Sequence, residues 1–153
     1  MPGHPEVSIV IPVHNEERIL ADSVAGLAYR LSDVTPAWEL WLAENGSTDR
    51  TPQVAAELAG RIAGVDWLQI GEPNYGRALR EGIGRARGRF VVCDEIDLCD
   101  VDFYRSSLGL LRTGKAEMVV GSKLAPGARD ERPWLRNVAT RVLNGMLRVG
   151  VGF

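Results

Sequence analysis

Residues 89–98 read Arg-Phe-Val-Val-Cys-Asp-Glu-Ile-Asp-Leu. The apolar part of this stretch, Phe90 to Cys93, is rich in residues that favour extended structure, and Gly88 separates it from the preceding segment. This pattern predicts a short buried strand. Five acids follow within nine residues: Asp94, Glu95, Asp97, Asp100 and Asp102. The stretch therefore predicts a core strand with an acidic carboxyl end.

Two of these acids are candidate metal ligands. Side chains alternate along an extended chain, so Glu95 and Asp97 are expected to point the same way. Neighbouring carboxylates repel unless a cation lies between them. Their oxygen atoms suit a hard ion such as Mg²⁺ or Mn²⁺, often shared with substrate phosphates. The alternative is a solvated acidic turn in which Asp100 or Asp102 caps the next helix.

Composition sets broad limits on the class of protein. The 153 residues suffice for one domain with a hydrophobic core, and the net charge of −2 gives no reason to expect nucleic acid as a partner. Cys93 and Cys99 form no CxxC motif and no signal peptide is recognisable, which favours reduced thiols and a cytoplasmic protein. His4 and His14 lack the spacing of metal ligands, and no apolar run is long enough to span a bilayer.

Apolar runs and helical patterns alternate along the chain. Strands are expected at residues 7–13, with an end at Pro12, and at residues 38–43, 65–70, 90–93 and 118–121. The first expected helix follows a cap at Asn15 and has an apolar face of Leu20, Val24, Leu27 and Leu31. The second runs from a cap at Thr51 to residue 61. Further helices are expected from the end of the 71–76 loop to residue 86, and at residues 102–111 and 134–149. This order predicts an α/β fold, a mostly parallel sheet with helices on both faces.

Polar residues follow each of the first four expected strands. Ligands of open α/β sheets bind outside the carboxyl ends of the strands, because those ends share one edge. Residues 12–16, 44–49, 74–77 and 95–97 are therefore expected to converge at that edge.

Four segments in order resemble family 2 glycosyltransferases with the GT-A fold. Residues 7–16, Val-Ser-Ile-Val-Ile-Pro-Val-His-Asn-Glu, look like the opening of that family. Residues 44–49, Glu-Asn-Gly-Ser-Thr-Asp, resemble its nucleotide loop, and residues 74–79, Asn-Tyr-Gly-Arg-Ala-Leu, its Asn-x-Gly-Lys segment. Glu95-Ile-Asp97 stands where the family carries Asp-x-Asp. Gly-Ser-Lys at 121–123 and the basic stretch after it are similar to the polyprenyl- and dolichyl-phosphate mannosyl- and glucosyltransferase branch.

The resemblance implies a single GT-A, Rossmann-like domain over residues 1–153. Its nucleotide-sugar-binding part would cover about 5–122, and the start of an acceptor region about 123–153, with truncation at the C-terminus. The implied activity is inverting, metal-dependent transfer of a sugar from a GDP- or UDP-linked donor, with Mg²⁺ or Mn²⁺ as cofactor. A polyprenyl phosphate is one acceptor that the branch suggests.

The resemblance also implies roles for individual residues. Asp97 and Glu95 would bind the metal ion and thereby support catalysis. Glu44 would contact the base or ribose, and the other residues implied to bind substrate are Pro12, Val13, Glu16, Asn45, Asn74, Arg77, Lys123 and Arg136. Arg77 would reach the diphosphate, and Arg136 would hold an acceptor phosphate because arginine binds phosphate bidentately.

Structural roles compete with these assignments. Glu16 can favour a helix N-terminus, Glu44 and Asn45 can form a turn, and Arg77 can be a solvated helix residue. The sequence also departs from the family pattern, since Glu95 and Glu44 replace aspartates. Cys99 stands where the lipid-phosphate branch often has glutamine, and soft sulfur is a poor ligand for Mg²⁺.

The expected last helix, residues 134–149, has a broad apolar face and a basic face that includes Arg141 and Arg148. Such a helix suits peripheral contact with the inner face of a membrane, since each basic residue gains about 1 kcal/mol near anionic lipid. The alternative is that its apolar face covers the sheet or pairs with a second subunit in a homodimer.

Three other classes of function compete with the glycosyltransferase. A nucleotide-sugar-binding module without turnover would share the same site. A nucleotidyltransferase would share the sheet and the acid pair, but no Gly-rich, Lys-containing loop follows the first strand. A dinucleotide-binding dehydrogenase is disfavoured because no GxGxxG motif follows Val13. No general base is evident, and an already ionised phosphate acceptor would need none, whereas a sugar hydroxyl would.

Overall fold

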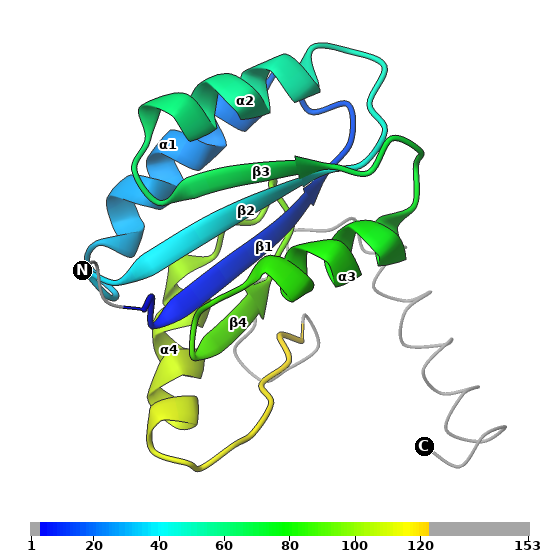
Figure 1. The fold of residues 1–153 in the computed structure, drawn as a ribbon. Helices are drawn as coiled ribbons and strands as arrows, with labels where there is room; N and C mark the ends of the chain where they lie inside the picture. Colours follow the sequence, from blue (N-terminus) through cyan, green and yellow to red (C-terminus); the bar gives the residue numbers. More distant parts are fainter. Residues whose placement is uncertain (1–3, 123–153) are drawn as a thin grey trace, which may run out of the picture. The chain divides into compact units, whose positions relative to one another are not determined.

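The computed structural model describes residues 4–122, and the structural statements below concern that range. Four strands, β1 (Val7–Val13), β2 (Trp38–Glu44), β3 (Val65–Gln69) and β4 (Phe90–Cys93), form one parallel sheet in the order β3-β2-β1-β4. Helices α1 (Leu20–Leu31), α2 (Thr51–Arg61), α3 (Tyr75–Arg85) and α4 (Val101–Arg112) follow the strands in turn (Figure 1). By its contacts the chain divides into two units, Met1–Val119 and Val120–Phe153, and the fold belongs to the first.

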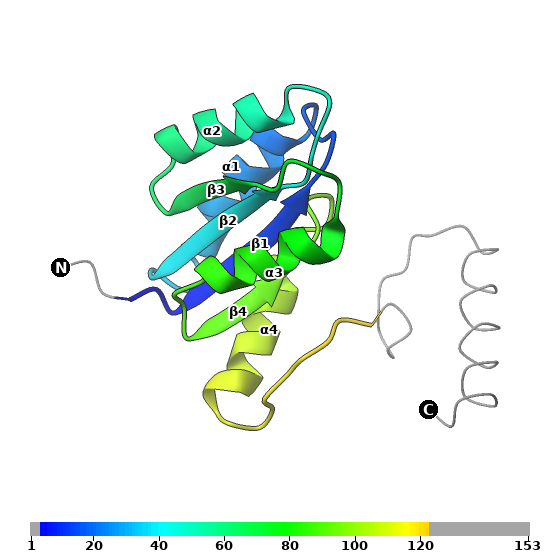
Figure 2. The same cartoon turned by 45° about the vertical axis from the view of Figure 1, so that its right-hand side comes forward.

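Helices cover both faces of the sheet, which confirms the expected architecture. Helices α1, α2 and α4 pack on one face around a core that includes Ile9, Ile11 and Leu27. Helix α3 covers the other face, where Ala78 packs with Ala43 and Leu68 (Figure 2). Gly82 allows this helix to approach β1 closely, because a Cβ atom there would overlap the Val10 side chain.

The first strand runs through Pro12 and does not end there, as the sequence suggested. Val10 accepts a hydrogen bond from Asp94 N on the β4 side, whereas Val13 accepts one from Asn45 N on the β2 side. By alternation the backbone of Pro12 faces the β4 side, beyond the last paired residue of β4, Cys93. The missing N–H therefore costs no ladder bond, and Pro12 stays paired with Ala43 of β2.

Two expected helix caps are wrong. Helix α1 begins after Ile19, not after Asn15, and Asn15 has a φ of +58° in the loop before it. Helix α2 begins at Thr51, and its N-cap is Arg50. Both polar side chains bond to other loops, since Asn15 Oδ1 accepts from Thr48 N and Thr51 Oγ1 accepts from Glu16 N. The apolar face of α1 is buried as expected.

The expected strand at residues 118–121 is absent. This segment has no regular secondary structure, and the side chains of Met118 and Val120 are 79% and 77% exposed. A strand needs a partner ladder, and none is formed by this segment within residues 4–122. The expected helix at 134–149 lies outside the described residues.

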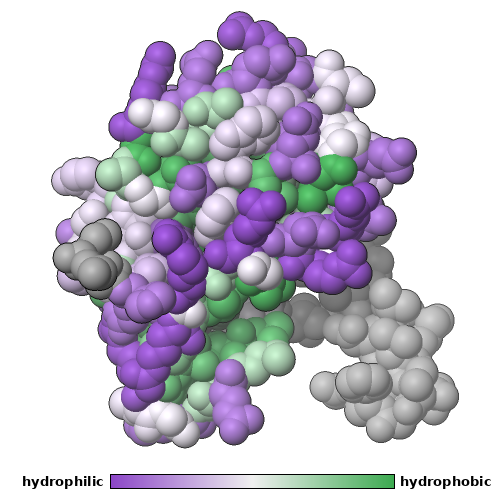
Figure 3. Space-filling view, in the orientation of Figure 1, coloured by the Kyte–Doolittle hydropathy of each residue, from purple (hydrophilic) through white to green (hydrophobic). Residues whose placement is uncertain are grey.

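Strand β4 is paired on one side only within the described range. Val91 on this strand and Ile83 on α3 are more than two fifths exposed. Figure 3 shows hydrophobic residues gathered over β4, beneath α3, with hydrophilic residues around them. Among residues 4–122, no helix has the length and apolar character needed to cross a bilayer.

At the amino ends of the strands, a buried carboxylate on β2 bonds to β1 and to the segment before β4. Glu39, only 2% exposed, accepts hydrogen bonds from Ser8 Oγ at 2.6 Å and from Arg87 N at 2.7 Å. Its second oxygen accepts from Nε and Nη2 of Arg87 at 2.9 and 2.6 Å. Burial alone raises the pKa of Glu39, but the bonds from Ser8 and Arg87 outweigh burial and hold the pKa below its ordinary value.

Candidate functional site

The loops after β1 and β2 are bonded to each other at the carboxyl edge of the sheet. His14 Nδ1 donates to the carbonyl oxygen of Asn45 at 2.8 Å, because a carbonyl can only accept. Asn15 N donates to Ser47 Oγ at 3.0 Å, and Asn15 Oδ1 accepts from Thr48 N at 2.8 Å. The first two polar segments therefore converge as the sequence predicted.

The loop after β3 joins the same cluster through Asn45 and Asn74. Asn45 Oδ1 accepts from Asn74 N at 2.5 Å, and Asn74 Oδ1 in turn accepts from Arg77 N at 3.0 Å. Asn74 is the N-cap of α3, which is a structural role. Asn45 thus fixes where the first turn of α3 begins.

Gly46 makes the close approach of these loops feasible. Its φ is +67°, a conformation that favours glycine. A Cβ atom at this position would lie 2.7 Å from Pro73 N and 2.8 Å from Pro73 Cδ. The glycine at position 46 therefore has a steric cause in the fold.

Glu44 is fully buried at the end of β2, and only one of its two carboxylate oxygens has a hydrogen-bond partner among the described residues. Its Oε1 accepts from Ser47 N at 2.5 Å, whereas Oε2 is buried and has no hydrogen-bond partner among the described residues. An unpaired buried carboxylate oxygen costs free energy unless a donor reaches it. Oε2 of Glu44 is therefore an unsatisfied acceptor beneath the loops at this edge of the sheet.

The acidic segment after β4 is a turn, not an extended chain. Glu95 O accepts from Leu98 N at 3.1 Å, so the turn begins right after the strand. The expectation of an extended chain from Glu95 to Asp97, on which the expected strand alternation depended, is therefore wrong. Asp100 is the N-cap of α4, as the alternative interpretation had it, since its side chain accepts from Asp102 N and Phe103 N.

Two tyrosines hold this turn from opposite faces of the sheet. Tyr75, the first residue of α3, donates from its hydroxyl to Glu95 Oε1 at 2.5 Å. Tyr104 of α4 donates to Asp94 Oδ2, while Asp94 Oδ1 accepts from Glu95 N at 2.8 Å. The bond to Glu95 raises the pKa of Tyr75 to about 12, and burial together with Asp94 raises the pKa of Tyr104 further. Both phenols are therefore protonated donors at neutral pH.

Two acids of the turn, Glu95 and Asp97, keep carboxylate oxygens of the type that hard divalent cations bind. Residues 4–122 contain no group of three His, Cys, Asp or Glu side chains able to hold a metal ion by themselves. The exposed carboxylate of Asp97 bonds to no other described residue, and Glu95 keeps one oxygen free. Two carboxylates plus substrate phosphates is the ligand set that Mg²⁺ commonly takes in proteins.

Cys99 is not placed to complete such a site. Its thiol is buried and lies 3.4 Å from the carbonyl oxygen of Ile96. Burial and the nearby Asp94 raise the pKa of the Cys99 thiol to about 11. The expected free thiols are confirmed for both Cys93 and Cys99.

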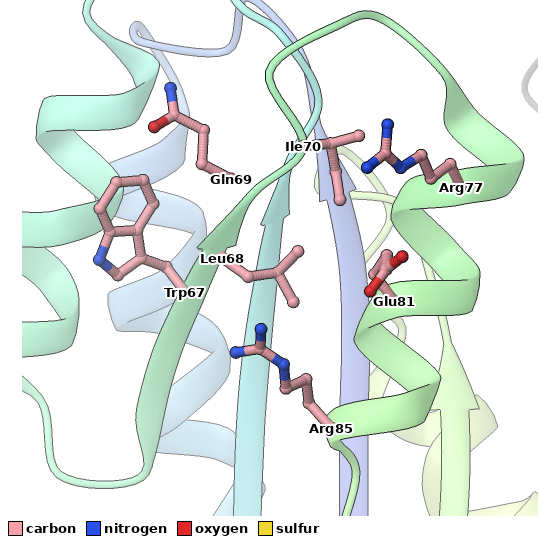
Figure 4. Close-up of a pocket in the computed structure, with 7 residues that line it drawn as sticks. All are labelled: Trp67, Leu68, Gln69, Ile70, Arg77, Glu81 and Arg85. Atoms are coloured by element: carbon pink, nitrogen blue, oxygen red, sulfur yellow. The ribbon is translucent and has the colours of Figure 1, made fainter.

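A separate groove of about 470 Å³ lies between β3 and α3 (Figure 4). It is lined by Trp67, Leu68, Gln69, Ile70, Arg77, Glu81 and Arg85. Arg77 is the one predicted site residue among these. The guanidinium of Arg77 thus lines this groove, whereas the acidic turn is contacted by Tyr75.

The remaining predicted residues differ in exposure. Pro12 and Val13 are buried, and the Val13 side chain belongs to the hydrophobic core. Glu16 is half-buried in the loop after β1, and its backbone N donates to Thr51. Lys123 and Arg136 lie outside the described residues.

The two tyrosine contacts were not predicted from the sequence. Twenty residues separate Tyr75 from Glu95, and ten separate Tyr104 from Asp94. No local periodicity links such positions, so only the packing of α3 and α4 against the end of β4 reveals them.

The sequence is similar to those of known proteins. The model of the family described as glycosyl transferase family 2 matches residues 8–147. Glycosyltransferase AglD of Haloferax volcanii is 30% identical over 148 residues, which cover 94% of this chain and 24% of that protein. A dolichyl-phosphate beta-glucosyltransferase of Trichomonas vaginalis is 30% identical over 128 residues, or 76% of this chain and 39% of that protein. The chain thus spans less than half the length of these relatives.

A solved structure shares the fold. The chain matches Staphylococcus aureus TarS, residues 1–349 in complex with UDP, with a TM-score of 0.59 and 17% identity. The match covers 83% of this chain and 40% of that one. At this identity the likeness concerns the fold alone, which is the GT-A fold expected from the sequence.

Proposed function

The chain belongs to glycosyl transferase family 2, and from this premise we propose that it transfers a sugar from a UDP- or GDP-linked donor with inversion at the anomeric carbon. The observation that carries the proposal is the convergence of half-satisfied Glu44 and the acidic turn at one edge of the sheet. The matched relatives and the UDP-bound fold neighbour support a nucleotide-sugar donor.

The proposed roles follow from where charge and hydrogen-bond capacity lie. The free oxygen of Glu44 accepts a hydrogen bond from the base or ribose, beside Asn45. Asp97 and Glu95 are the residues that would hold Mg²⁺ or Mn²⁺. A divalent cation bound there would offset the negative charge that the nucleoside diphosphate gains as it leaves. Glu16, Asn74 and the backbone of Pro12 and Val13 border the nucleotide, and Arg77 approaches from the groove side.

The proposed acceptor is a polyprenyl phosphate. A relative in Trichomonas vaginalis carries dolichyl phosphate in its name. An ionised phosphate needs no general base, which fits the lack of an evident base in the sequence. Lys123 and Arg136 would bind the acceptor phosphate at a cytoplasmic membrane surface. Salt-sensitive co-sedimentation of the chain with anionic vesicles tests this membrane contact, and no binding at low salt would contradict it.

A transfer assay tests the proposed function. The protein is incubated with Mn²⁺, a radiolabelled UDP- or GDP-linked hexose and a polyprenyl phosphate in detergent, and the lipid phase is counted. Labelled lipid with release of nucleoside diphosphate supports the proposal. Binding without transfer or donor hydrolysis indicates a nucleotide-sugar-binding module, and pyrophosphate release from a nucleoside triphosphate indicates a nucleotidyltransferase.

Replacing Glu44 with alanine should weaken binding of the preferred nucleoside diphosphate about tenfold, the loss of one charge-assisted hydrogen bond. Binding of inorganic pyrophosphate should be unchanged, because Glu44 is proposed to face the base or ribose. Titration calorimetry measures both constants. Equal losses for both ligands would instead assign Glu44 to the structure of the turn, through its bond to Ser47 N.

A further inference from the structure

The groove between β3 and α3 lies at a free edge of the sheet. Strand β3 is the end strand and pairs with β2 alone within the described residues. On the ladder side, Ile70 N donates to the carbonyl oxygen of Glu44. Backbone groups alternate between the two sides of a parallel strand, so those of Trp67 and Gln69 point away from β2. Their N–H and C=O groups have no backbone partner within residues 4–122.

The groove reaches this unpaired backbone. The buried side chains of Leu68 and Ile70 point toward α3 and form the apolar floor of the groove. The side chains of Trp67 and Gln69 point away from α3 (Figure 4), although both residues line the groove. They therefore line it with atoms close to the backbone. The free hydrogen-bonding groups of β3 and the groove thus belong to one surface.

Three charged side chains of α3 form the opposite wall of the groove. Arg77, Glu81 and Arg85 are four residues apart and point toward β3 in Figure 4. None of the three side chains forms a hydrogen bond or an ion pair with another described residue. The guanidinium of Arg85 lies over the ring of Trp41, 5.9 Å from its centroid. The wall therefore presents positive, negative and positive charge in order, the charged row.

The spacing of the charged row matches an extended chain. Four residues of a helix rise by about 6 Å, and two residues of a strand span about 6.6–6.8 Å. Side chains at every second position of a strand point to the same face. Over the whole row the two repeats therefore differ by only about 1–2 Å, a difference that long charged side chains accommodate.

We propose that this groove binds an extended peptide segment that adds to the free edge of β3 and carries an acidic, a basic and an acidic residue at alternate positions. The backbone groups of Trp67 and Gln69 bond to the added strand, and its alternate side chains pair with the charged row. A strand added to a sheet edge takes its affinity from main-chain hydrogen bonds and its specificity from alternate side chains. The inference does not depend on sugar transfer.

A second copy of this chain is a poorer occupant of the groove. Antiparallel pairing with another β3 brings one acid, Asp66, to this face, whereas the charged row has two arginines. A two-fold axis also sets two charged rows side by side in opposite directions, with glutamate opposite glutamate and arginine opposite arginine. Like charges therefore oppose the symmetric pair, and a separate peptide with the complementary pattern fits better.

Nuclear magnetic resonance titration of ¹⁵N-labelled protein with the capped peptide Glu-Val-Lys-Val-Glu tests the inference. Saturable shifts are expected at Trp67 and Gln69, and hydrogen exchange of these two amides should slow, because the added strand accepts their N–H groups. The peptide Glu-Val-Glu-Val-Glu should bind the wild type about fivefold more weakly, because its central residue repels Glu81. General attraction between acids and the two arginines predicts the opposite order.

Gln69→Pro tests the strand pairing without a change of charge. Proline removes the outward N–H and is tolerated on an edge strand, since the ladder to β2 does not use that group. The variant should melt close to the wild type and bind the lysine-containing peptide at least about tenfold more weakly. Gln69→Ala keeps the N–H group and is the matched control that should bind this peptide like the wild type.

Glu81→Lys tests the charge pattern at the centre of the row, which meets the central residue of the peptide in either strand direction. The variant should reverse the order of the two peptides, so that the all-glutamate peptide binds about fivefold more tightly than the lysine-containing one. Glu57→Lys changes the same charge at an exposed position of α2, on the other face of the sheet, and should leave the order as in the wild type.

Several results would overturn the inference. These are the lack of saturable binding at about 1 mM peptide, tighter binding of the all-glutamate peptide by the wild type, and unchanged binding by folded Gln69→Pro. A wild-type dimer in sedimentation that Gln69→Pro dissociates would assign the edge to a second copy instead. The proposed function stands or falls by its own transfer assay, because none of these measurements involves a nucleotide sugar.

Discussion

Replacing Glu39 with alanine should lower the free energy of unfolding by about 2–4 kcal/mol, although Glu39 lies at the edge opposite the candidate site. The substitution leaves two buried or half-buried donors, Ser8 Oγ and Arg87 N, without their acceptor. Each unsatisfied donor costs about 1–3 kcal/mol. For a chain of this size the loss corresponds to roughly 5–15 °C in melting temperature. Urea unfolding followed by circular dichroism measures the change.

Glu6 provides a matched control. It also accepts two hydrogen bonds from one arginine, Arg112, at 2.7 Å each, but its side chain is 29% exposed. The hydrogen bonds from Arg112 and Thr35 lower the pKa of Glu6 to about 2, but solvent screens this partly exposed pair. Such pairs usually contribute about 0–1 kcal/mol, so Glu6→Ala should cost less than Glu39→Ala. Equal costs for the two variants would contradict the role given to burial at Glu39.

The pH dependence gives the Glu39 prediction a second check. The folded pKa of Glu39 is lower than its ordinary value of 4.5, so its stabilising contribution is present above that pH. It is lost as the pH falls through the lowered folded pKa. The stability gap between the wild type and Glu39→Ala should therefore be full at neutral pH and narrow in acid. A gap that stays constant down to acid pH would mean that cavity formation, not the carboxylate, causes the loss.

Replacing Asp97 with asparagine should weaken Mn²⁺-dependent binding of UDP or GDP by on the order of 100-fold. Substitution of a residue that only orients a metal ligand already lowers metal affinity by up to about this factor. When the nucleotide is present at one hundred times its dissociation constant, the free energy of unfolding of the wild type should rise by about 2.7 kcal/mol. This corresponds to roughly 5–10 °C in melting temperature. The variant should lose most of this shift. Its own stability should be close to the wild type, because the Asp97 side chain is exposed and bonds to no other described residue.

Asp102→Asn is the control for charge alone. Asp102 is an exposed acid in the first turn of α4 and pairs with Arg105 at 2.6 Å. Its substitution removes the same charge near the turn but no proposed ligand, so nucleotide binding should change less than about threefold. If both variants lost nucleotide affinity to a similar extent, the total negative charge of the segment, not metal ligation by Asp97, would explain the effect.

The sequence predicted the parts of the fold that depend on local patterns. Segments rich in apolar residues identified the four strands of the sheet within residues 4–122, and the spacing of Leu20, Val24, Leu27 and Leu31 identified the buried face of α1. The convergence of the loops followed from parallel topology alone, and contacts such as Asn45 with Asn74 confirm it.

The failures concern two helix caps, the acidic turn, the end of β1 and the expected strand at residues 118–121, which joins no ladder within residues 4–122. Asn15 and Thr51 look like helix caps in sequence, but the loop opposite each of them offers a better partner. Strand alternation was extended to Asp97, although the chain turns at Glu95. Pro12 was expected to end β1 because proline cannot donate a ladder hydrogen bond. The sequence does not show that β4, the strand on that side, stops at Cys93 and so never pairs with Pro12. Such outcomes depend on register and on packing between distant elements.

Paramagnetic broadening by Mn²⁺ locates the bound cation in the fold. Mn²⁺ added in small amounts to ¹⁵N-labelled protein with UDP or GDP broadens the amide signals closest to it. We expect broadening at residues 94–98 and 44–47 that depends on the nucleotide and is abolished by EDTA. Broadening confined to the groove between β3 and α3, or unaffected by the nucleotide, would contradict the claim that this sheet edge binds a nucleotide sugar through a cation.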